Sequence, residues 1–196
     1  WFLGSLIVAG AMLATYTRMS IVALLGGLIF ALAILGRLKL IGSGVAAGAL
    51  GILMTPGLAQ RFLDKNDRIK LYAASIEAAM DSPWLGHGDT AYLEYIFANS
   101  NRYHTMFGVA GSTPHNSILY AFFRYGIGGA VLTALLLAVP ILYFAVQVRR
   151  QTGKARILAL AGVATFVSFA LQSQTNNLLD IPKVTFYFFA LWVGLR

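Results

Sequence analysis

The sequence has 196 residues, of which 58% are hydrophobic and only 11% are charged, and its net charge is +8 at pH 7. Soluble domains usually carry about a quarter charged residues, so this composition indicates an integral membrane protein. Most basic residues flank apolar segments, so we expect no nucleic-acid-binding surface, and the lack of cysteine excludes disulfides and thiolate metal sites.

Six apolar segments follow one another along the chain and predict an all-α, polytopic bundle of membrane helices. They cover roughly Trp1–Ala14, Met19–Gly36, Leu40–Thr55, Gly126–Val148, Ile157–Ser173 and Thr185–Leu195. We therefore expect three spans in residues 1–56, a large loop in 57–114 and three spans in 115–196. The first and last segments are short for a span of about 20 residues, which predicts a fragment of a longer protein. The third is rich in glycine, which suits close contact between helices.

The distribution of charge predicts the orientation of these spans. The connections 37–39 and 149–156 carry six basic residues and no acid, whereas 56–114 holds six of the seven acids and five basic residues. By the positive-inside tendency, the two short connections are cytoplasmic and the large loop is outside. Arg18 then heads a span on the outer side, either as a snorkelling interfacial cation or with a functional role.

The outer loop contains a predicted amphipathic helix at Asn66–Met80, and Arg68 lies near its start. Ile69, Tyr72, Ile76 and Met80 fall on one face of this helix. We expect that face to lie on the membrane surface, and the Asp81-Ser82-Pro83 sequence to end the helix. Residues 98–113 are rich in Asn, Ser and Gly, which predicts a mobile loop or lid.

The next helix is predicted to begin at Ser112 or Thr113 as the capping residue, with Pro114 in its first turn. His115 and Asn116 would then also lie in that first turn. A helix over 114–148 would be about 50 Å long, which exceeds the roughly 30 Å hydrocarbon core. The first turns should therefore protrude from the membrane, or the helix should break at the glycine cluster of residues 126–129.

His115 is the main candidate for chemistry, although a capping or interfacial role is the alternative. The positive end of the helix dipole disfavours imidazolium, so a neutral ring could accept a proton as a general base. The N–H groups of the same helix end could bind phosphate. Arg68 and Arg18 could add guanidinium groups that bind a diphosphate. This combination suits a hydroxyl nucleophile and a diphosphate leaving group.

The remaining polar residues are weaker candidates. Arg124 is nine residues past His115, so it faces away on a straight helix and suits an interfacial or structural cation. His87 and His104 are interpreted as solvated or structural. Asp64 and Asp67 lack a further metal ligand nearby in sequence, and Asp180 could be a helix cap or a supporting acid. We therefore expect neither a metal nor another cofactor.

Three motifs resemble those of the O-antigen ligase/Wzy C-terminal superfamily. His115-Asn116, nine residues and then Gly126-Ile127-Gly128-Gly129 resemble its His-[Asn/Ser/Gln]-x9-Gly-x-x-[Gly/Thr/Trp] signature. The residues Thr17-Arg18-Met19-Ser20 resemble its Ser/Thr-Arg entry to a span. The run from Asp67-Arg68 to Ser82-Pro83-Trp84-Leu85-Gly86-His87-Gly88 resembles the conserved run of its large periplasmic loop, with Ser82 in place of Asn.

The resemblance implies a GT-C-like helical membrane fold and metal-independent glycan transfer at the periplasmic face of the bacterial inner membrane. The donor would be a glycan linked to undecaprenyl diphosphate, and the acceptor of a ligase would be lipid A-core. His115 would match the essential His of the family, and Arg68 and Arg18 its loop arginines. Asn116 and Arg124 are the predicted substrate-binding residues.

The sequence is also compatible with other functions. The same superfamily includes O-antigen polymerases and protein O-oligosaccharyltransferases, and the single large outer loop favours a ligase. A lipid or solute transporter should carry ionisable residues within its spans, where this sequence has almost none. A purely structural membrane scaffold would not need arginines on the outer side.

Overall fold

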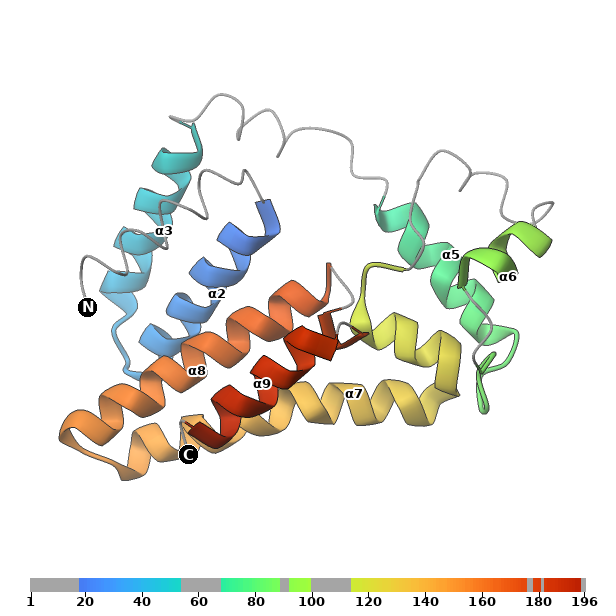
Figure 1. The fold of residues 1–196 in the computed structure, drawn as a ribbon. Coiled ribbons are helices and arrows are strands. Elements are labelled where there is room, and N and C mark those ends of the chain that lie inside the picture. The colour runs from blue at the N-terminus through green and yellow to red at the C-terminus, as the bar shows by residue number, and fades with distance from the viewer. Residues whose placement is uncertain are drawn as a thin grey trace. The chain divides into compact units, whose positions relative to one another are not determined.

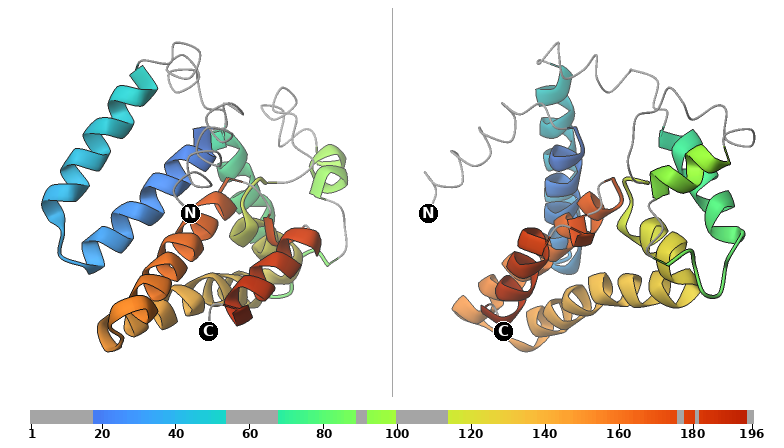
Figure 2. Two further views of the ribbon diagram at one scale, coloured as in Figure 1. Left: turned by 60° about the vertical axis from the view of Figure 1, so that its left-hand side comes forward. Right: turned by 45° about the vertical axis from the view of Figure 1, so that its right-hand side comes forward.

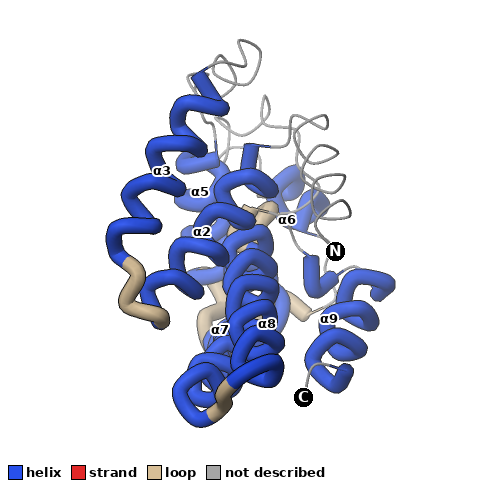
Figure 3. Tube along the Cα trace, turned by 90° about the vertical axis from the view of Figure 1, so that its left-hand side faces the viewer, coloured by secondary structure: helices blue, strands red, loops and turns tan. Residues whose placement is uncertain are grey.

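The computed structural model describes residues 18–53, 68–88, 92–99, 114–175, 178–180 and 182–194. The regular elements in these ranges are all helical, as Figures 1 and 3 show. They are α2 (Arg18–Ile34), α3 (Leu38–Leu53), α5 (Arg68–Met80), α6 (Tyr92–Ala98), α7 (Ser117–Arg150), α8 (Gly153–Ser173), the 3₁₀ helix η2 (Leu178–Asp180) and α9 (Pro182–Gly194). The all-α class is thus confirmed for the described residues, and the predicted segment Trp1–Ala14 lies outside them.

Two of the described helices, α7 and α8, are long and apolar enough to cross a membrane, whereas Met19–Ile34 and Val184–Gly194 are apolar but shorter. Helix α7 leaves large apolar side chains exposed, among them Leu132 (69%) and Leu142 (63%). Contiguous exposed apolar surface of this kind suits contact with lipid. The arrangement of six spans stays a prediction.

The chain forms two compact units, and α7 contributes to both. The first unit contains α2, α3, the part of α7 from Pro140 onward, and α8 up to Gln172. The second contains α5, α6, the part of α7 up to Val139, η2 and α9. The predicted site residue Arg18 therefore belongs to the first unit, whereas Arg68, His115 and Arg124 belong to the second.

In the first unit, α2 and α3 run side by side in opposite directions (Figures 1 and 2), and α2 packs closely on α8. A Cβ on Gly27 would lie 2.3 Å from the Ala164 carbonyl oxygen, so the backbones approach closely there. The prediction that the glycines of the third segment provide such contact is wrong for Gly42 and Gly44. A Cβ at either position would meet nothing within 4 Å.

In the second unit, α5 packs through a face of mostly small side chains. Its buried residues are Leu71, Ala74, Ser75, Ala78 and Ala79, and the core is completed by Tyr92 and Ile96 of α6 and Phe123 of α7. On the face predicted from the apolar spacing, Ile76 and Met80 are 46% and 58% exposed. Small residues thus serve contact within the protein, while part of the most apolar face is exposed.

Candidate functional site

The start of α7 differs from the sequence prediction. The helix begins at Ser117, so neither Ser112 nor Thr113 caps it and Pro114 is not in its first turn. Asn116 is the capping residue, because its side-chain oxygen accepts hydrogen bonds from the N–H groups of Ile118 and Leu119, each at 3.0 Å. His115 therefore lies just before the helix and not in its first turn.

The Asn116 amide has a second set of partners. Its Nδ2 donates to the side-chain oxygen of Gln174 at 3.2 Å and, at 3.4 Å, to the Gln174 backbone oxygen, which also accepts a hydrogen bond from Tyr72 of α5. Asn116 is 8% exposed, so these bonds satisfy a buried amide. The cap itself bears on the predicted phosphate site at this helix end, because the Asn116 oxygen already occupies the N–H groups of Ile118 and Leu119; phosphate binding here stays a prediction.

His115 has an unusual backbone conformation. Its φ is +52°, and it is the one non-glycine residue with a positive φ among the residues that the structure describes. Such a conformation costs on the order of 1–3 kcal/mol, and strained residues of this kind cluster at functional sites. The buried Pro114 and Asn116 flank it, while His115 itself is partly exposed. The fold thus holds a partly accessible imidazole at a defined position.

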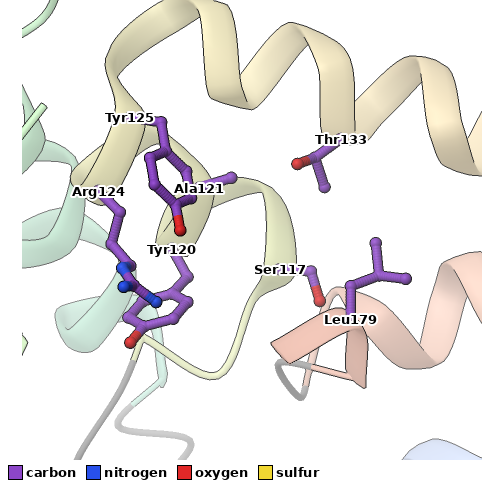
Figure 4. A pocket seen from close by; sticks show the side chains of 7 residues that line it. All are labelled: Ser117, Tyr120, Ala121, Arg124, Tyr125, Thr133 and Leu179. Carbon is purple, nitrogen blue, oxygen red and sulfur yellow. The ribbon is translucent and has the colours of Figure 1, made fainter. Parts of the chain in front are cut away.

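Helix α7 is broken at the glycine cluster, which is one of the two arrangements predicted from its length. Gly126 has φ 65° and ψ −163°, a conformation that only glycine adopts readily. The break divides α7 into a short segment, residues 117–125, and a long segment, residues 127–150. Figure 4 shows the bend between them.

The loop that follows α5, residues 82–88, satisfies the backbone groups freed by this break; we call it the docking loop. The Phe123 carbonyl accepts from His87 N–H at 2.8 Å, and the Arg124 carbonyl accepts from Gly88 N–H at 2.9 Å. Ile127 N–H in turn donates to the Pro83 carbonyl at 2.8 Å. The loop therefore supplies partners where the helical hydrogen-bond ladder is interrupted.

Two glycines make this close docking feasible. A Cβ on Gly126 would lie 2.2 Å from the Trp84 carbonyl oxygen, and a Cβ on Gly86 would lie 2.4 Å from the Arg124 carbonyl oxygen. Gly86 also has a positive φ of 71°. No larger residue fits at either position without moving backbone, so each of the two glycine motifs found in the sequence receives a structural explanation.

His87 anchors the docking loop to three helices, α5, α6 and α7. Its ring stacks on Phe123 at a centroid distance of 4.5 Å and lies 4.3 Å from the Tyr95 ring. Its Nε2 lies 2.8 Å from the Ala78 carbonyl oxygen, so Nε2 carries the proton and caps the last turn of α5. The structure thus gives His87 a packing role, in agreement with the structural interpretation of this residue.

Arg124 lines a cavity of about 160 Å³ in the second unit, together with Ser117, Tyr120, Ala121, Tyr125, Thr133 and Leu179. In Figure 4, Tyr120, Arg124 and Tyr125 lie on one side of this cavity, and Ser117, Leu179 and Thr133 lie across from them. The Arg124 Cζ atom is 5.5 Å from the Tyr120 ring centroid and 5.2 Å from the Tyr125 ring centroid. The cation is therefore held beside two aromatic rings.

The two predicted diphosphate ligands begin helices. Arg18 is the first residue of α2 and Arg68 the first residue of α5, but their side chains lie outside the described residues. Residues Asp64, Asp67 and His104 and the side chain of Asp180 also lie outside them. The convergence of Arg18 and Arg68 on His115 stays a prediction.

Sequence reasoning missed the docking loop, helix α6 and Gln174. Backbone contacts between residues about 40 positions apart leave no periodic pattern, although Gly86 and Gly126 marked both partners. Gln174 could not be identified from the sequence, because a single amide side chain in a polar connection can have many different roles.

The long apolar helices, with a strained histidine and a glycine break at the start of one of them, define a helical membrane protein with a polar site. The O-antigen ligase family model matches residues 3–134. An O-antigen ligase of Pseudomonas aeruginosa is 27% identical over 194 residues, which cover 96% of this chain and 44% of that protein. The chain therefore belongs to the O-antigen ligase family, and it spans less than half the length of this relative.

Proposed function

We propose that the protein containing this chain is an O-antigen ligase that transfers a glycan from undecaprenyl diphosphate to a sugar hydroxyl of lipid A-core. The reaction takes place at the periplasmic face of the bacterial inner membrane and needs no metal. The strained, partly exposed His115 beside a buried helix cap is the observation that carries the proposal. Family membership supports the reaction class.

In this mechanism His115 is the general base. It removes the proton of the acceptor hydroxyl as that oxygen bonds to the anomeric carbon of the donor sugar. The bond between this carbon and the diphosphate oxygen breaks, and undecaprenyl diphosphate leaves with the electron pair. Arg18 and Arg68 stabilise the charge of the departing diphosphate, while Arg124 contacts the glycan. Asn116 contributes to substrate binding indirectly, because it fixes the position of His115.

The length of α7 supports a site outside the hydrocarbon core. The long segment from Ile127 to Arg150 has 24 residues and is about 36 Å long, which suffices to cross a hydrocarbon core of about 30 Å. Its last turn carries Arg149 and Arg150, which favour the cytoplasmic side. The short segment and His115 at the other end are then left for the periplasmic interface.

The test uses the full-length protein with lipid-linked glycan and lipid A-core in EDTA, and identifies the product by mass spectrometry. The informative variant is His115→Asn, because asparagine tolerates a positive φ but is not a base near neutral pH. We expect this variant to insert into the membrane normally and to lose about 100-fold or more of its transfer rate. Transfer at the wild-type rate would refute the role of His115.

The same assay separates the ligase from the other members of the superfamily. A ligase joins glycan to lipid A-core, whereas a polymerase lengthens the lipid-linked glycan when donor is the sole substrate. A protein O-oligosaccharyltransferase instead modifies a Ser or Thr of an added acceptor protein. Product with lipid A-core alone is the result that we expect.

A further inference from the structure

The cavity beside Arg124 has the size and lining of a site for a single sugar ring. A protein cavity of about 150 Å³ admits a six-membered ring such as benzene, and this cavity measures about 160 Å³, so it admits the ring of one sugar while the ring substituents extend to its open side. Its lining is mixed, because Ser117 and Thr133 contribute hydroxyl groups and Ala121 and Leu179 contribute apolar surface. A pyranose has polar hydroxyl groups and apolar C–H faces. Hydroxyls that both donate and accept match the polar groups, and the small apolar surfaces match the C–H faces.

The position of Arg124 gives this cavity a preference for negative charge. Two tyrosine rings hold the guanidinium in place, with centroid distances of 5.5 and 5.2 Å. A guanidinium carries pairs of N–H groups along its edges, whose geometry fits the two oxygens of a carboxylate. The rings also limit the rotamer entropy that Arg124 loses when an anion binds.

The cavity lies next to the proposed base in the sequence and in the fold. Ser117 lines the cavity and follows directly after Asn116, which caps the helix beside His115. Both lie at the start of the short segment of α7. A sugar in the cavity would therefore be close to the sugar on which His115 acts.

We propose that the cavity, which we call the Arg124 pocket, binds one acidic sugar unit of the glycan substrate, with its carboxylate on Arg124. The sugar ring lies against Tyr125 and Leu179, and Ser117 and Thr133 bind ring hydroxyls. This inference rests on the proposed function for the identity of the substrate as a glycan. It adds a selection for a hexuronic acid over a neutral hexose.

Direct binding tests the proposal without catalysis. The full-length protein in nanodiscs is titrated with methyl β-glucuronide, methyl β-glucoside or inorganic phosphate, and binding is followed by saturation-transfer NMR. We expect the glucuronide to bind about tenfold or more tightly than the glucoside, because charge-assisted hydrogen bonds provide a difference of this size. Phosphate should not displace the glucuronide at equal concentration. Equal binding of the two sugars, or displacement by phosphate, would overturn the proposal.

Three variants locate this binding. Arg124→Gln should weaken glucuronide binding about tenfold or more and leave glucoside binding unchanged, whereas Tyr125→Leu should weaken glucuronide binding about two- to fivefold. Tyr187→Leu on α9 is the matched control, because Tyr187 is 65% exposed and does not line the pocket. Unchanged glucuronide binding in Arg124→Gln would refute the pocket, provided that this variant unfolds at the wild-type temperature.

The variant His115→Asn separates this proposal from the proposed function. We expect it to bind the glucuronide like the wild type while it loses transfer. If His115→Asn kept full transfer activity and Arg124→Gln still lost glucuronide binding, the mechanism would be wrong and the Arg124 pocket would stand.

Discussion

Replacement of Gly86 by alanine tests whether the docking loop holds the break in α7. The new Cβ would lie 2.4 Å from the carbonyl carbon and oxygen of Arg124 and 2.5 Å from the Tyr125 nitrogen. These are backbone atoms, so the contact is relieved only if the loop or the helix moves. Such overpacking costs about 1–3 kcal/mol, and the positive φ of 71° adds about 1–2 kcal/mol for a residue with a Cβ.

Gly88→Ala is the matched control for this substitution. Gly88 has a similar φ of 65°, but a Cβ there would meet nothing within 4 Å. The control therefore pays only the backbone cost of about 1–2 kcal/mol, whereas Gly86→Ala should cost about 2–5 kcal/mol in total. The difference between the two variants isolates the contact with Arg124.

Hydrogen exchange followed by mass spectrometry measures this local cost. The amides of His87 and Gly88 bond to the carbonyls of Phe123 and Arg124, so opening of the loop exposes them. We expect exchange in peptides covering 83–88 to become about 30-fold faster or more in Gly86→Ala, and about 5- to 30-fold faster in Gly88→Ala. Equal acceleration in the two variants would refute the close contact between loop and helix.

Three further predictions concern the site. His115→Gly should be as stable as the wild type in thermal unfolding and yet lose transfer, because relief of the positive φ offsets the entropy cost of glycine; a large loss of stability would show that the strain is not real. Arg68→Lys should reduce transfer about tenfold, and full activity would exclude paired hydrogen bonds from that side chain. His87→Phe should keep the ring stack and lose about 1 kcal/mol with the bond to Ala78; if it is as destabilising as His87→Ala, then stacking on Phe123 contributes little.

The sequence predicted the apolar helices and, as one of two alternatives, the break between the segments of α7. Long apolar runs and their polar connections depend on residue type alone, so α2, α3, α7, α8 and α9 fall where five of the six segments were expected. The glycine cluster and the excess length of 114–148 predicted either protruding first turns or a break, and the structure has the break at Gly126. The end of α5 at Met80, just before Asp81-Ser82-Pro83, was likewise encoded locally.

The start of α7 could not be chosen from local signals. Ser112 or Thr113 with Pro114 in the first turn is a good helix start, and so is Asn116 as a cap with Pro114 before it. The hydrogen bond from Asn116 to Gln174, 58 residues further along the chain, favours the second. A preference that depends on a distant partner leaves no trace in the local sequence.

The sequence predicted an apolar face of α5 on the membrane surface, and it did not predict the face that packs within the protein. Hydrophobic periodicity selects the largest apolar side chains, which here include Ile76 and Met80. The protein instead buries a face of small residues. Small side chains allow backbones and aromatic rings to approach the helix closely, as Tyr92 and Phe123 do. In a membrane protein lipid can cover the large side chains, so apolar character alone does not indicate the interior.

The spacing of the His-Asn-x9-Gly signature has a physical meaning in this fold. Nine residues, 117–125, form a helical segment about 14 Å long. This segment has fewer residues than the roughly 12–15 that an isolated helix needs in water. The segment is therefore held at both ends: Asn116 caps it and bonds to Gln174, and the docking loop bonds to its last carbonyls at Phe123 and Arg124. His115 precedes one end and the Arg124 pocket lies along the segment, so loss of either support should displace both together.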